Sequence, residues 1–203
     1  LQTLVAEGLL ISRHGAGLKV AEDLGSSISD PLITLLESSP DAVVDYLRFR
    51  AMIEGECAAI VAAEATGAEI DAILDILNRM QTAHDAQDEE AESRLDTEFH
   101  MAIVEASRNV VTIQVARSLH ELLLRFIARS RAVIYDDEKA RAQFHSDHKA
   151  IGTAIKARDA QAARAAIHRH LRTVEETLAR KSDEIARQEM AEKRRAWVAE
   201  AGS

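Results

Sequence analysis

The sequence predicts an all-α fold, an antiparallel bundle of six or seven helices that follows a short β-hairpin. Three features of the 203 residues support this prediction. Aromatic residues make up only 3% of the chain, and two prolines and eight glycines interrupt it. Ala, Leu, Ile, Glu and Arg dominate the composition and favour helices over sheets. Beyond residue 30, apolar residues recur at helical spacing.

The N-terminal segment is the part of the chain where strands are expected. Leu1 to Glu7 is predicted to be a short helix that ends at Gly8. Two short apolar runs, Leu9 to Ile11 and Leu18 to Val20, flank a glycine-containing turn, which is typical of a β-hairpin. The serine-rich residues 23–29 are interpreted as a linker, so a domain boundary is expected there. Because the chain begins with leucine, we expect it to be a fragment that lacks upstream residues.

The remaining residues, 30–203, are predicted to be helical, and most helices have a recognisable start. Asp30-Pro31 and Ser39-Pro40 each place a capping residue before a proline at the first helical position, so a short and a long helix begin there. The long helix is expected to end near Ala65. Further helices are predicted to begin at Thr66-Gly67, near Asp88, at Asn109, near Asp136 or Asp137, and at Asp159.

Composition and charge exclude several classes of protein. The net charge of -9 argues against a chain that coats nucleic acid by bulk electrostatics, although a small local contact surface is compatible with it. The single cysteine, Cys57, rules out an internal disulfide framework. No apolar run approaches the ~20 residues needed to span a bilayer. We therefore expect a cytoplasmic protein that makes no membrane contact.

An aspartate and three histidines are predicted to face the interior of the bundle. Asp96 and His100 lie about 40° apart on one helix, among apolar residues. His148 and His170 fall on the apolar stripes of two later helices, whereas His168 lies about 160° from His170 and faces away. Three imidazoles and one carboxylate suit Zn²⁺, Ni²⁺, Mn²⁺ or Fe²⁺ and leave positions open for a ligand. We expect a divalent transition metal, with zinc as the first choice.

Three alternatives stay open at this stage. Each histidine taken alone could be a core residue with its own hydrogen-bond partner. His120, which has apolar neighbours at helical spacing, is a possible further member of the pocket. Arg50 is predicted to enter an apolar helix face, where an unpaired guanidinium is costly. It could pair with Glu54 one turn away, or it could bind the carboxylate of a small ligand through paired hydrogen bonds.

Four segments of the chain together resemble GntR-type transcription regulators of the FadR subfamily, and the resemblance covers nearly the whole sequence. The segments are "GLLISRHGAGLKVAE", "SDPLITLLESSPDAVVDYLRFRAMIEGECAAIVAAEAT", "DTEFHMAIVEASRNVV" and "HKAIGTAIKARDAQAARAAIHRHL". The resemblance implies that residues 1–22 are the C-terminal part of a winged helix-turn-helix, made of a remnant helix and a β-hairpin wing. It also implies that residues 30–203 form an all-helical, metal- and effector-binding FCD domain, with residues 23–29 as the linker.

The resemblance also implies roles for particular residues. The family's Asp-x-x-x-His and two later histidines hold a metal, and they match Asp96, His100, His148 and His170. Arg13, His14 and Gly15 would form the wing tip, where small and basic groups fit a DNA minor groove.

The sequence around Arg50 and Glu54 is most similar to the regulators of pyruvate dehydrogenase and of lactate utilisation. This similarity implies a small 2-oxo or 2-hydroxy acid effector such as pyruvate, lactate or glycolate.

The leading hypothesis is therefore a homodimeric regulator, without enzyme activity, whose operator binding responds to a small carboxylate. Residues 1–22 carry balanced charges, so this chain is expected to sense its ligand but to bind DNA poorly. One alternative is a metal-dependent enzyme acting on a small hydroxy acid, because an open metal position could activate water or O₂. Another is a helical bundle with a purely structural metal.

Overall fold

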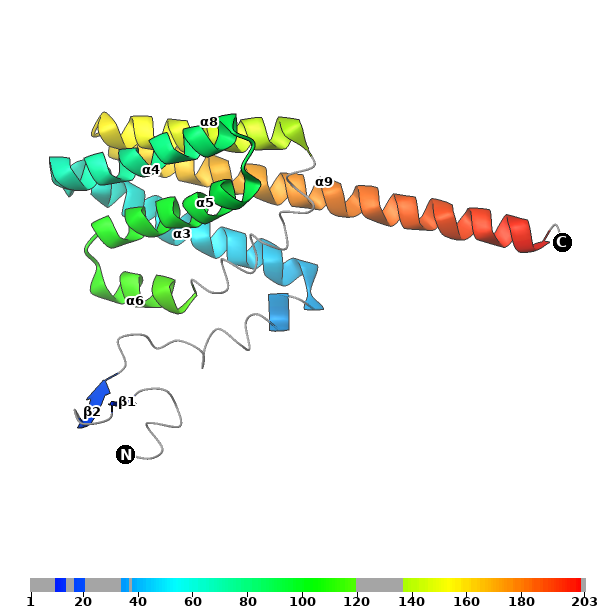
Figure 1. Cartoon of the computed structure of the whole chain (residues 1–203), viewed down its shortest axis with the longest axis horizontal. Helices are drawn as coiled ribbons and strands as arrows, with labels where there is room; N and C mark the ends of the chain where they lie inside the picture. Colours follow the sequence, from blue (N-terminus) through cyan, green and yellow to red (C-terminus); the bar gives the residue numbers. More distant parts are fainter. Residues whose placement is uncertain (1–9, 14–16, 21–33, 37, 120–136, 202–203) are drawn as a thin grey trace.

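Helices form most of the structure, a computed structural model that describes residues 10–13, 17–20, 34–36, 38–119 and 137–201 (Figure 1). The long elements of the described residues are α3 (Pro40–Glu64), α4 (Gly67–Asp85), α5 (Glu89–Ala106), α6 (Val110–Ser118), α8 (Glu138–Lys156) and α9 (Ala160–Ala201). These helices confirm the predicted all-helical bundle.

The predicted hairpin is present ahead of the helices. Strand β1 (Leu10–Arg13) pairs antiparallel with β2 (Gly17–Val20), and Leu10 lies opposite Val20. Several predicted features lie outside the described residues, so the structure does not test them. These are the helix over residues 1–7, the wing-tip residues His14 and Gly15, the linker over residues 23–29, the Asp30-Pro31 helix start and His120.

Capping side chains explain where the helices begin. The side chain of Ser39 accepts a hydrogen bond from the backbone N–H of Ala42, and Thr66 forms a reciprocal capping box with Glu69. Asp88, Asn109, Asp137 and Asp159 cap the next four helices in the same way. These six predicted starts are confirmed, and of the two candidates near the start of α8 the cap is Asp137.

The core lies where α3, α4, α5, α8 and α9 meet. Helix α9 packs against α3 and α8, α4 packs against α5 and α8, and α6 contacts α5 at the edge of the bundle. The largest fully buried side chains include Leu47, Ile73, Phe99, Ile103, Ile151, Ile155, Ile167 and Leu171. Gly55 lies at the contact between α3 and α9, and a Cβ there would lie 2.7 Å from Nε2 of His168, so that side chain would have to move.

The C-terminal half of α9 leaves the bundle as a single helix (Figure 1). Its last buried residues are Val174 and Thr177, and beyond Lys181 nearly every described side chain is exposed. The C-terminal half of α9 is therefore a solvated helix end. Among the described residues, no helix combines the length and the apolar character that crossing a bilayer requires.

Candidate metal centre and adjoining pocket

Four potential metal ligands from three helices come together in the bundle. Asp96 and His100 lie on α5, His148 on α8 and His170 on α9. Each offers one ligand atom, and the four atoms lie within 4.8 Å of one another. The histidines are buried, with 1 to 3% of their surface exposed, whereas the Asp96 side chain is 20% exposed. Asp96 is therefore the most exposed member of the cluster.

The local sequence explains why these side chains point inward. Asp96 and His100 are one helical turn apart, so they project from the same face of α5. On the same side, Phe99 and Ile103 are fully buried and hold that face against the core. Apolar neighbours on α8 and α9 do the same for the other two histidines, namely Ile151 for His148 and Ile167 and Leu171 for His170.

The distances within the cluster suit a shared cation. Oδ1 of Asp96 lies 2.8 Å from Nε2 of His148 and 3.9 Å from Nε2 of His100. The two Nε2 atoms are 3.4 Å apart. Ligand atoms bound to one ion at 2.0 to 2.2 Å are separated by roughly 3 to 4 Å. The donor set and its spacing thus fit a divalent transition metal, although metal binding by these residues stays a prediction.

The electrostatics of the cluster favour the protonation states that ligate metals. Burial by itself would raise the pKa of Asp96, but the imidazoles of His148, His100 and His170 lower it well below its usual range. Burial lowers the pKa of His170 well below its usual value, and His148 and His100 lower it further. Asp96 is therefore ionised and His170 neutral at pH 7, the forms in which carboxylate and imidazole bind a metal.

A buried ion pair between Arg50 and Glu54 contacts the ring nitrogen of His100 that lies away from the cluster. Arg50 donates hydrogen bonds to Glu54 from Nε (2.6 Å) and Nη2 (3.3 Å), and both residues are buried. Oε2 of Glu54 also lies 2.6 Å from Nδ1 of His100. Arg50 thus pairs with Glu54, which is one of the two alternatives that the sequence left open for it. A carboxylate at Nδ1 directs Nε2 of the same ring toward the metal position.

Asp147 is a functional candidate that the sequence did not single out. It is 3% exposed, and its Oδ1 accepts a hydrogen bond from Nε2 of Gln143 at 2.9 Å. Its Oδ2 lies 3.9 Å from Nδ1 of His170, and neither atom has a hydrogen-bond partner among the described residues. A small side-chain movement would pair them, so Asp147 can orient His170 as Glu54 orients His100.

Replacing Asp147 with asparagine is expected to weaken metal binding about 10- to 100-fold without changing the number of ions bound, because the outer partner of a ligating histidine loses its negative charge. Titration against a chromophoric chelator measures both quantities. Asp75→Asn is the matched control, because Asp75 is exposed on α4. Equal metal affinities for both variants and the unaltered protein would show that Asp147 does not orient His170.

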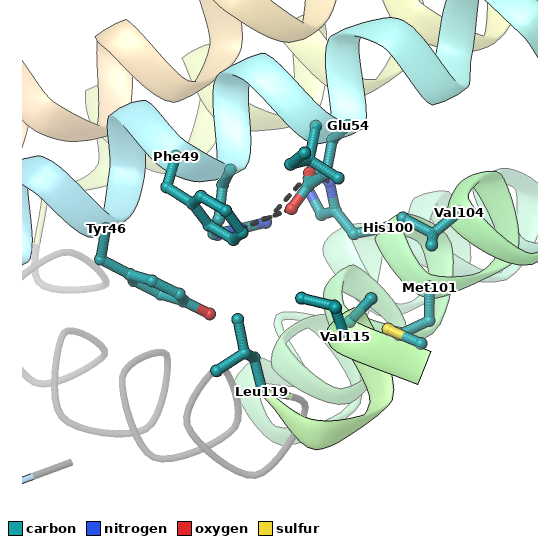
Figure 2. A pocket seen from close by; sticks show the side chains of 11 residues that line it. Tyr46, Phe49, Glu54, His100, Met101, Val104, Val115 and Leu119 are labelled. Carbon is teal, nitrogen blue, oxygen red and sulfur yellow. Dashed lines mark hydrogen bonds and ion pairs between the residues drawn. The ribbon is translucent and has the colours of Figure 1, made fainter. Parts of the chain in front are cut away.

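A pocket adjoins the cluster between α3, α5 and α6 (Figure 2). Its empty volume is about 440 Å³, part of which is open to solvent. Arg50, Glu54 and His100 line it together with apolar side chains from the three helices. The pocket and the cluster thus share His100, and Arg50 lies where a bound carboxylate could reach it. The apolar lining was not identified from the sequence, because it depends on how α6 packs against α3 and α5.

The other described histidines lie outside the cluster. His168 is exposed, as its position on α9 predicts. His84 and His145 are partly buried, and their rings stack with centroids 4.4 Å apart, outside the cluster. His120 and the wing-tip residues His14 and Gly15 lie outside the described residues, and the Arg13 side chain is not described either.

Comparison with known proteins yields one consistent family. The FCD domain family matches residues 45–173. The putative L-lactate dehydrogenase operon regulatory protein of Escherichia coli is 34% identical over 194 residues, covering 92% of this chain and 72% of that protein. The transcriptional regulator LutR of Bacillus subtilis is 29% identical, covering 88% and 81%. A solved structure of a Streptococcus agalactiae GntR protein matches with a TM-score of 0.68 and 20% identity, covering 87% of this chain and 78% of that one.

Proposed function

Because the chain belongs to the FCD-domain family of GntR-type transcription regulators, we propose that it senses a small 2-oxo or 2-hydroxy acid at a metal-centred pocket. The observation that carries this proposal is the convergence of Asp96, His100, His148 and His170 beside a pocket that contains Arg50. A relative named as a regulator of an L-lactate dehydrogenase operon supports the choice of acid.

Different residues would bind the metal and the carboxylate of the acid. Asp96, His100, His148 and His170 would hold a divalent transition metal, with zinc as the first choice, which offers coordination positions to ligand oxygens when bound. Arg50 would bind the carboxylate, because a guanidinium has five N–H donors and Glu54 accepts hydrogen bonds from two of its nitrogens. Glu54 keeps Arg50 in place through the buried ion pair, so the binding groups are preorganised.

Binding at this pocket would regulate DNA binding by shifting the balance between two arrangements of a cytoplasmic homodimer. Two copies would place their DNA-binding domains on the two halves of a palindromic operator, with Arg13, His14 and Gly15 at the tip of each wing. The domain division is part of the same proposal, with residues 1–22 in the DNA-binding domain and residues 30–203 sensing the ligand. Operator binding must in turn alter the affinity for the acid, because coupling between sites is reciprocal.

Replacing Arg50 with lysine is expected to raise the acid concentration needed for a half-maximal response by about 10-fold or more. Lysine keeps the charge but cannot form the paired hydrogen bonds of a guanidinium. The measurement is a gel shift of the metal-loaded, full-length protein on DNA from upstream of its own gene, titrated with pyruvate, lactate or glycolate. Arg48→Lys is the matched control, because Arg48 is exposed on the same helix.

Two outcomes would contradict the proposal. If no acid changed the retardation of any DNA, the chain would not be a sensor of these acids. If the acids acted equally well after chelation, the metal would have no part in sensing. A purely structural metal would give a third pattern, in which chelation lowers the melting temperature and acids release no heat on titration.

A further inference from the structure

Two histidines outside the ligand cluster form a stacked pair between α4 and α8, which pack against each other (Figure 1). The rings of His84 on α4 and His145 on α8 are nearly parallel, with an interplanar angle of 8° and centroids 4.4 Å apart. The lone pair of an imidazole nitrogen lies in the ring plane, so lone pairs of two parallel rings do not converge on one ion. The pair therefore suits proton binding better than metal binding.

We propose that the His84–His145 pair is a pH-sensitive contact, which joins α8 to α4 at neutral pH and opens in mild acid. Two neutral rings can stack, whereas two imidazolium rings at this distance repel each other. Opening would separate the first half of α8 from α4 and would involve neither the metal nor an acid ligand.

The hydrogen bonds of the pair are satisfied when both rings are neutral. Nε2 of His145 lies 2.8 Å from Oε1 of Gln81, and the amide nitrogen of Gln81 donates to Asp85 at 2.7 Å. The amide oxygen therefore accepts the hydrogen bond from Nε2 of His145. Nδ1 of His84 lies 3.1 Å from Oε1 of Glu92 and donates to that carboxylate. Each neutral ring thus already uses its one N–H group, and a further proton would add a charge.

The charges around His145 disfavour that further proton. The pKa of His145 is about 4, below the usual 6.5, chiefly because the ring is partly buried. Three positive or titratable side chains contribute to the same shift, namely His84, Lys149 and His148. The negative charge of Glu92 has the opposite effect, but Arg141 of α8 already pairs with this carboxylate at 2.7 Å.

The pair lies in the part of α8 where polar contacts contribute much of the packing. In this first half of the helix, Arg141 pairs with Glu92 on α5, and His145 contacts α4. The second half is held by buried apolar side chains, such as Ile151 and Ile155. Protonation of His145 would therefore loosen the first half of α8 and leave the second half packed.

Urea unfolding of the full-length protein, kept metal-free with a chelator, tests the inference at about pH 7.5 and about pH 5. Because the folded protein binds the His145 proton less readily than the unfolded chain, this stabilisation is complete above pH 6.5 and is lost as the pH falls toward 4. Such a shift raises the unfolding constant by up to about 25-fold over the interval, and partial exposure of the ring reduces this factor.

Replacing His145 with phenylalanine keeps a ring in the stack but removes the proton site. We expect the rise in the unfolding constant on acidification to be about 5- to 25-fold smaller in this variant. His168→Phe is the matched control, because His168 is exposed on α9, and its rise should equal that of the unaltered protein. If His145→Phe does not fold, His84→Phe removes the other charge of the pair and should also diminish the rise.

Hydrogen exchange at the same two pH values shows whether the contact opens locally. In the unaltered protein, acidification should lower the protection of amides in the first half of α8 more than that of amides around Ile167 on α9. In His145→Phe this difference should disappear.

Two results would overturn the inference. The first is an equal rise in the unfolding constant for the unaltered protein and for the variants of the pair. The second is an equal loss of protection in α8 and α9 of the unaltered protein, which would mean that the pair stabilises the whole fold and does not open by itself. Both results would leave the proposed acid sensing untouched.

Discussion

Replacing His148 with alanine is expected to weaken zinc binding by more than about 100-fold. His148 Nε2 lies 2.8 Å from Asp96 and 3.4 Å from Nε2 of His100, so it is central to the ligand cluster. Loss of an outer partner alone costs about 10- to 100-fold in metal affinity, and loss of a ligand should cost more. Competition with a chromophoric chelator, monitored at equilibrium, measures the dissociation constant.

His168→Ala provides the control for this prediction. His168 lies on α9, two residues from His170, but it is exposed and takes no part in the cluster. Its variant should bind zinc as the unaltered protein does. Equal affinities for zinc in the His148 and His168 variants would mean that the cluster is not the binding site.

Replacing Glu54 with glutamine is expected to lower the free energy of unfolding of the metal-free protein by about 3 to 5 kcal/mol. The change removes the charge partner of the buried Arg50 guanidinium, which cannot lose its proton. For a chain of this size, the melting temperature should fall by roughly 6 to 20 °C. Chemical denaturation measures the change. Glu56→Gln, on the same helix but exposed in its pair with Arg164, should cost no more than about 1 kcal/mol.

The pH dependence of stability identifies the same ion pair. Burial by itself would raise the pKa of Glu54, but Arg50 and His100 lower it to about 2, below the usual 4.5. Because the folded protein binds this proton less readily than the unfolded chain, Glu54 stabilises the fold above pH 4.5. That contribution is lost as the pH falls from about 4.5 to 2. The unaltered protein should lose more stability over this interval than Glu54→Gln, and parallel curves would contradict the assignment.

Local signals in the sequence were sufficient for most of the helix boundaries. Side-chain caps at Ser39, Thr66, Asp88 and Asn109 define helix starts within one residue, because the side chain satisfies backbone N–H groups a few residues later. The hairpin could also be predicted, but its strands extend one or two residues closer to the turn than the apolar runs do. Strand ends depend on backbone pairing, which apolar patterns do not specify.

The ligand cluster was accessible to sequence reasoning because helical geometry fixes which side of a helix a residue faces. The same geometry gave no indication of Asp147. It precedes His148 by one residue and therefore lies about 100° away on α8. Its partner His170 belongs to α9, and the sequence does not specify how two helices align along their length. The contact between Glu54 and His100 likewise depends on how α3 and α5 pack.

The central claim is that Asp96, His100, His148 and His170 share one cation, and anomalous diffraction from zinc-loaded crystals tests it most directly. The claim predicts a single strong anomalous peak per chain, about 2.0 to 2.2 Å from one atom of each residue. A peak at another place, or no peak in crystals soaked with zinc at neutral pH, would contradict it.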